Sequence, residues 1–143
     1  MNKFGYLFLL LFCSFVVACS NDDNDDTNTS TDIIGTWELV EAKYDEEIYW
    51  EEELQLYEEF NFWPTVTFLS NGTLISRNID HSPRGELITD KGTYTYNSKT
   101  GKIITKYPEE EIGVFFIKFT KANTFMMWEE GYEEYYEIWK KKK

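Results

Sequence analysis

Short runs of β-branched and aromatic residues recur along residues 33–143, and most of them end at a turn signal. Thr65-Val66-Thr67-Phe68 alternates strictly between polar and apolar residues, as half-buried strands do. The dipeptide Asn71-Gly72 that follows is a strong hairpin signal. The same rhythm predicts eight strands, at about residues 35–44, 63–70, 73–78, 87–96, 102–107, 113–120, 124–128 and 132–140.

Successive strands joined by hairpins close most simply into an up-and-down antiparallel barrel, because closure removes exposed strand edges. We therefore expect an all-β domain with an eight-stranded barrel over residues 33–143, and an open sheet or a sandwich is the alternative. Strand alternation assigns the side chains that face the interior. The set expected to point inward is Phe68, Leu74, Tyr94, Tyr96, Ile103, Phe115, Phe119, Met127, Tyr136 and Ile138.

A barrel of eight strands is either filled by its own side chains or just wide enough to hold one small ligand. Both outcomes stay open at this point. Tyrosine rings and methionine beside aliphatic groups suit an apolar or amphipathic ligand. The residues expected to contact it are Phe68, Leu74, Tyr94, Tyr96, Phe115, Phe119, Met127 and Tyr136.

Residues 45–61 break the strand rhythm. This segment contains eight acidic residues and no Lys or Arg, and Trp50, Leu54 and Tyr57 follow helical spacing. It predicts a short helix with one apolar stripe. The helix could pack on the wall or end of the barrel, or serve as a lid over an open end.

The first residues have the composition of a secretory signal. Lys3 precedes an apolar stretch over 4–17, and the small residue Ala18 comes directly before Cys19. The stretch is shorter than the roughly 20 apolar residues of a membrane-spanning helix. An ordinary signal cleaved elsewhere, or a buried helix with a chance cysteine, is the alternative.

The Val16-Val17-Ala18-Cys19 ending resembles the lipobox of bacterial lipoproteins. The resemblance implies that residues 1–18 are a cleaved signal peptide, that Cys19 carries lipid, and that the protein is anchored to the outer membrane. Residues 19–32 are acidic and polar, so we expect a disordered tether. Acidic residues after a lipidated cysteine resemble the export signal of Bacteroidota surface lipoproteins, which favours the cell surface over the periplasmic face.

The folded segment resembles a lipocalin-like domain of the short type found in Bacteroidota lipoproteins. Four segments carry the resemblance: 34–37 (Ile-Gly-Thr-Trp), 67–73, 92–94 and 135–140. It implies that Gly35 allows a tight turn at the start of the first strand and that Trp37 closes the barrel floor. It also implies a small apolar or amphipathic ligand inside the barrel.

Charge and residue types exclude several functions. The formal net charge of -12 argues against direct binding to nucleic acid. His81 is the only histidine, and no nucleophile or metal-binding motif accompanies it, so we expect no enzyme activity, metal or cofactor. The alternative function is an envelope interaction or structural protein that binds a protein or glycan partner through outward aromatics such as Trp50 and Trp139.

Overall fold

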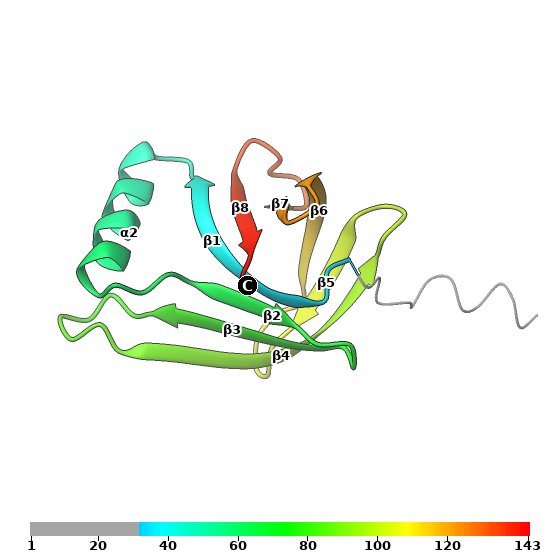
Figure 1. Cartoon of the computed structure of the whole chain (residues 1–143), viewed down its shortest axis with the longest axis horizontal. Coiled ribbons are helices and arrows are strands. Elements are labelled where there is room, and N and C mark those ends of the chain that lie inside the picture. Colours follow the sequence, from blue (N-terminus) through cyan, green and yellow to red (C-terminus); the bar gives the residue numbers. More distant parts are fainter. Residues whose placement is uncertain (1–31) are drawn as a thin grey trace, which may run out of the picture.

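The computed structural model describes residues 32–143, so the expected signal peptide (1–18), Cys19 and nearly all of the expected tether (19–32) lie outside the described residues. Within that range the chain forms eight strands and one helix (Figure 1). In chain order these are β1 (Gly35–Lys43), α2 (Glu47–Glu59), β2 (Thr65–Phe68), β3 (Thr73–Ile79), β4 (Leu87–Asn97), β5 (Lys102–Lys106), β6 (Gly113–Lys121), β7 (Thr124–Glu129) and β8 (Tyr136–Lys141).

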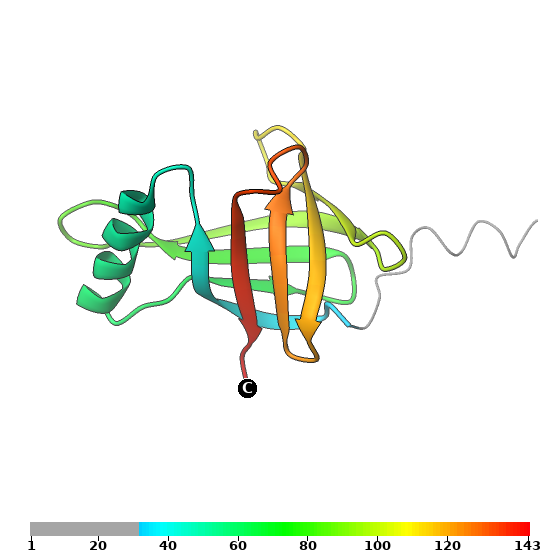
Figure 2. The ribbon, with the colours of Figure 1, turned by 90° about the horizontal axis from the view of Figure 1, so that it is seen from above.

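The strands form one closed antiparallel barrel in sequence order, and β8 pairs with β1 to complete it (Figure 2). The predicted all-β barrel is confirmed, and the open sheet and the sandwich are wrong. The eighth strand begins later than predicted. Residues 132–135 form a turn, in which the Tyr135 backbone N–H donates to the Tyr132 carbonyl at 3.0 Å.

The closing pair of strands contains a β-bulge at Val40. The register between β1 and β8 shifts between Leu39 and Glu41, and Val40 is 40 % exposed. A bulge adds one residue and so reverses the alternation beyond it. Trp37 and Leu39 are buried before the bulge and Ala42 after it, so the bulge keeps Lys43 off the inward face of β1.

One end of the barrel is sealed by aromatic rings, and we call this end the floor. Trp37 is fully buried there, and its ring centroid lies 4.6 Å from that of Phe125 and 5.9 Å from that of Phe119. The Trp37 indole N–H donates to the Ile33 carbonyl at 2.8 Å. This bond attaches Ile33, near the start of the described chain, to the floor.

Helix α2 lies at the opposite end, which we call the mouth (Figures 1 and 2). Tyr57 from its apolar stripe is 2 % exposed, and Trp50 packs against the core. Tyr57 lies between the rings of Trp50 and Trp63, with centroid separations of 6.4 and 5.8 Å. The predicted helix is therefore confirmed, and it packs at the end of the barrel. Trp50 is not an outward aromatic.

A polar contact ties α2 to the loop between β3 and β4. One carboxylate oxygen of Glu53 lies 2.8 Å from Nε2 of His81, and the other accepts the Tyr57 hydroxyl at 2.5 Å. The His81 side chain is 70 % exposed. The single histidine thus holds the helix near the mouth from the solvent side.

The interior differs from the expected set in one strand. Phe68, Leu74, Tyr94, Tyr96 and Ile103 are buried as predicted, and Phe115, Phe119 and Met127 pack against that core. In β8, however, the inward assignment of Tyr136 and Ile138 is wrong. Trp139 is 7 % exposed and belongs to the core. Strand alternation therefore puts Glu137 on the inward face with Trp139, and Tyr136 and Ile138 on the outward face.

We expect Trp37→Ala to lower the free energy of unfolding by about 3–5 kcal/mol, because it removes a fully buried ring and leaves a cavity at the floor. Urea unfolding followed by circular dichroism measures this loss. Trp128→Ala is the matched control, since Trp128 stacks on Phe116 with a ring-centroid separation of 6.0 Å and is only partly buried. Equal losses in the two variants would contradict a structural role for the floor.

Candidate functional site

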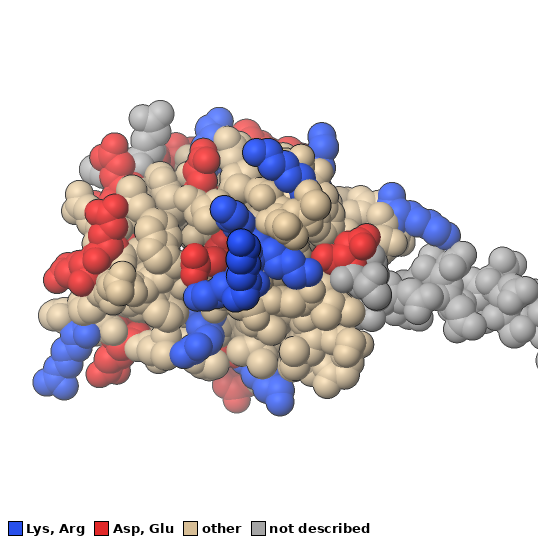
Figure 3. Space-filling model, in the orientation of Figure 1, with Lys and Arg blue, Asp and Glu red and all other residues tan. Residues whose placement is uncertain are grey.

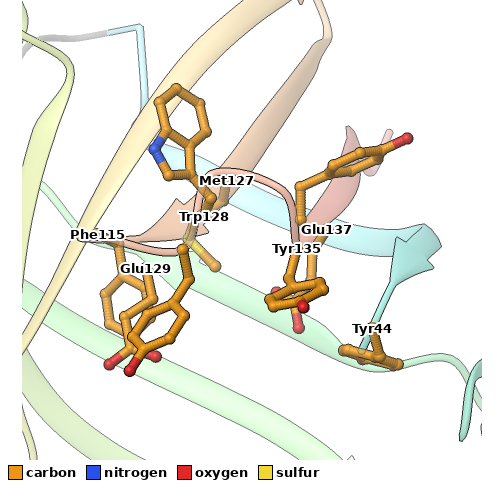
Figure 4. Close-up of a pocket in the computed structure, with 9 residues that line it drawn as sticks. Tyr44, Phe115, Met127, Trp128, Glu129, Tyr135 and Glu137 are labelled. Carbon is orange, nitrogen blue, oxygen red and sulfur yellow. The ribbon is translucent and has the colours of Figure 1, made fainter. Parts of the chain in front are cut away.

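A hollow of about 330 Å³ opens at the mouth. It lies between the end of β1, the start of β6, the end of β7 and the start of β8, beneath the turn that joins the last two strands (Figure 4). This volume is at the lower end of the range for small-molecule sites. Its lining is Tyr44, Phe115, Met127, Trp128, Glu129, Tyr132, Tyr135, Tyr136 and Glu137.

A second hollow of about 170 Å³ lies deeper between the barrel walls. It is almost entirely apolar, and it shares Phe115 and Met127 with the hollow at the mouth. The barrel is therefore filled at the floor and hollow toward the mouth. The deeper lining is Val66, Phe68, Leu74, Ser76, Ile103, Thr105, Tyr107, Phe115, Met127 and Trp139.

Two carboxylates line the mouth pocket, Glu129, which is exposed, and Glu137, which is half-buried (Figure 4). The Trp139 indole N–H donates to the carboxylate of Glu137 at 3.0 Å, and the Tyr44 hydroxyl also hydrogen-bonds to it. Burial raises the pKa of Glu137, and the two hydrogen bonds act in the opposite direction. None of the ion pairs between described residues involves this carboxylate.

The bulge in β1 positions Tyr44 as a hydrogen-bond partner of Glu137. Ala42 pairs with Glu137 across the closing strands, and Tyr44 follows two residues later on the same side. Burial raises the pKa of Tyr44 above its ordinary value, and the charges of Glu137 and Glu53 raise it further. The phenol therefore stays protonated and acts as a donor toward the carboxylate.

Not every aromatic residue at the mouth faces the pocket. Figure 4 shows the Trp128 indole pointing away from the other lining side chains, and it stacks on Phe116 outside the barrel. Tyr135 crosses the mouth, and its hydroxyl donates to Asp45 at 2.9 Å. This contact joins the turn before β8 to the segment that leads into α2.

The predicted ligand contacts divide into three groups. Phe68, Leu74, Phe115 and Met127 line the hollows. Tyr94 and Tyr96 are buried in the core and Phe119 packs at the floor, and none of these three lines either hollow. Tyr136 lies on the opposite side of β8 from Glu137 and borders the pocket from the strand edge.

Sequence reasoning missed Glu137, Tyr44 and Tyr135. Both faces of β8 carry large apolar side chains, so alternation alone could not orient this strand. A charged residue between Tyr136 and Ile138 was easily assigned to solvent. The available signal was Trp139, two residues further on, because an indole N–H can supply a donor to a half-buried carboxylate.

Acidic side chains surround the mouth. Glu129, Glu130, Glu133 and Glu134 come from the end of β7 and the following turn, and the one helix of the described chain has no basic residue in its last turn. Figure 3 shows acidic side chains over the α2 end of the visible face, while lysines gather around the C-terminus. The potential at the mouth is therefore negative.

Metal and catalytic groupings are not seen among residues 32–143. No cluster of three or more His, Cys, Asp or Glu in this range is placed to hold a metal ion. In the same range, no helix is long and apolar enough to cross a membrane. The pocket itself presents a half-buried carboxylate and aromatic rings.

Comparison of the chain with protein-family models, with curated proteins and with solved structures found no match.

We expect Glu137→Gln to stabilise the protein at neutral pH. The raised pKa of Glu137 means that ionisation costs more in the folded chain than in the unfolded one. In the unfolded chain the pKa of a glutamate is about 4.3, and in the folded chain the pKa of Glu137 is higher. The carboxyl therefore begins to destabilise the fold as the pH rises past the lower pKa, and its full effect is reached above the higher one. Urea unfolding over a pH series measures this difference, which should vanish in acid.

The control is Glu134→Gln, which removes the same charge from an exposed turn. Its stability relative to the unmodified chain should change little over the same pH series. A Glu137→Gln variant whose relative stability is also independent of pH would contradict the raised pKa of this carboxyl.

Proposed function

We propose that this chain is a lipid-anchored, lipocalin-like protein of the cell envelope that binds one small apolar or amphipathic molecule at the barrel mouth. The observation that carries the proposal is the pair of hollows that share Phe115 and Met127 above a sealed floor. An apolar ligand part would occupy the deeper hollow, and a polar part would reach the carboxylate of Glu137.

The arrangement of the mouth also supports ligand binding. Aromatic rings from the residue after β1, from α2 and from the turn before β8 lie at the opening, where Tyr44 contacts Trp50 and Tyr135 donates to Asp45. Small-molecule sites have this combination of apolar walls and few polar groups. The alternative of partner binding through outward aromatics is weaker, because Trp139 is in the core and Trp50 packs at the mouth.

The anchoring part of the proposal rests on the lipobox sequence that ends at Cys19. It predicts an outer-membrane protein, with its barrel displayed at the cell surface rather than on the periplasmic side.

Native mass spectrometry of the full chain, purified from the envelope, should show a bound small molecule of defined mass. Met127→Trp should abolish this mass, because Met127 lines both hollows and an indole would fill them. Met126→Trp is the matched control, since Met126 pairs with Ile138 on the opposite face of β7. Loss of the bound mass in both variants, or no bound mass in the unmodified chain, would reject the ligand-binding function.

Cys19→Ser should release the protein from the membrane fraction and abolish incorporation of labelled fatty acid. Cys13→Ser is the control, and it should leave both properties unchanged because Cys13 lies in the expected signal peptide. Protease added to intact cells should degrade the anchored barrel if it is displayed at the surface. Membrane attachment that survives Cys19→Ser would contradict the proposed anchor.

A further inference from the structure

We propose that the mouth pocket selects a small organic cation, namely an amine with an aromatic or apolar body, and that Glu137 binds its charged head. This inference rests on the proposed ligand-binding function and names the chemical class of the ligand. Three features of the described residues support it: a half-buried carboxylate that lacks a cationic partner, the aromatic rings that line the same pocket, and the acidic side chains near the opening.

The first feature is the unbalanced charge of Glu137. Its hydrogen-bond partners are the Trp139 indole and the Tyr44 hydroxyl, which are both neutral donors. A carboxylate offers about four acceptor positions, so these two donors leave acceptor capacity free. An ionised carboxylate held among protein atoms without a countercharge is costly, and a cation bound beside it offsets part of that cost. An ammonium head supplies both the charge and additional donors.

The second feature is the aromatic lining that surrounds this carboxylate. Tyr44, Phe115, Tyr132 and Tyr135 come from three different segments and line the same pocket as Glu137 (Figure 4). The faces of aromatic rings carry negative charge density, and they attract organic cations more strongly where water is excluded. The same rings offer an anionic head group no comparable attraction.

The third feature is the charge around the opening. Glu129 lines the pocket, and Glu133 and Glu134 occupy the exposed turn beside it. Glu130 in the same turn is paired with Lys102 at 3.2 Å, so its charge is compensated. The nearby helix α2 contributes further acids, and its sequence contains no Lys or Arg. This potential attracts cations and repels fatty-acid carboxylates. An anionic amphiphile would have to bring its head group toward Glu137 through this field.

The space available fits an amine with a compact apolar body. The deeper hollow, next to Phe115 and Met127, is lined mainly by aliphatic and aromatic side chains, and its volume is about 170 Å³. An aromatic ring or short alkyl chain would lie there, with the ammonium group at the level of Glu137. The two hollows thus match the two ends of one molecule.

Three matched probes test this inference: 2-phenylethylammonium, the neutral 2-phenylethanol and the anionic 3-phenylpropanoate. Isothermal titration calorimetry uses the full chain in nanodiscs of zwitterionic lipid, with empty nanodiscs as the blank. We expect the amine to bind roughly 10- to 100-fold more tightly than the alcohol, as a charge-assisted hydrogen bond provides. The carboxylate probe should bind most weakly.

Glu137→Gln should remove the preference for the amine over the alcohol. Glu134→Gln is the matched control for net charge, and it should retain the preference. Circular dichroism verifies that both variants are folded. Raising the salt from roughly 0.01 to 1 M shortens the Debye length from about 30 to 3 Å, so it should weaken binding of the amine more than that of the alcohol.

The outcomes separate this inference from the function on which it rests. If the alcohol or the carboxylate binds as tightly as the amine, or if Glu137→Gln keeps the preference, cation selection is overturned while a ligand-binding barrel stands. If none of the three probes binds and the purified chain carries no small molecule, the inference and the proposed function both fail.

Discussion

The candidate site depends on how β1 and β8 pair when they close the barrel. A regular β1 would present Glu41 and Lys43 on the face that carries Trp37 and Leu39. The extra residue at Val40 reverses this order, so Ala42 is buried opposite Glu137 and Tyr44 reaches its carboxylate. Without the bulge, Glu41 would lie opposite Glu137 and Lys43 would take the place of Tyr44, so Glu137 would have charged neighbours from β1 instead of a neutral phenol.

The barrel divides its interior between stability and recognition. The floor is packed by Trp37, Phe119 and Phe125 in edge and tilted ring contacts, which leave no room for a ligand. The mouth is covered by rings from α2, but it retains hollows beside Phe115 and Met127. Because well-packed residues hold the closed end, the open end can tolerate an enclosed charge and an acidic helix.

The fold could be predicted from the sequence to a large extent, because its strands alternate regularly and their turns carry strong signals. Asn71-Gly72 marks the β2–β3 hairpin, and Trp50 and Tyr57 mark the buried stripe of α2. The candidate site could be predicted only in part. The inward positions of Phe115 and Met127 follow from strand alternation. The position of Tyr44 depends on a β-bulge, which no residue pattern in the sequence predicts. Glu137 lies in a strand with two apolar faces, where the charged residue suggests the wrong orientation.

The hydrogen bond of the Trp37 indole bears on which end of the barrel a membrane anchor would be attached to. Its hydrogen bond to Ile33 holds the beginning of the described chain at the floor, at the far end of the molecule from α2 (Figures 1 and 2). A lipid attached at Cys19 would therefore pull on the sealed end. The opening would then lie at the end away from the attachment, so an amine could enter it without passing the anchored end.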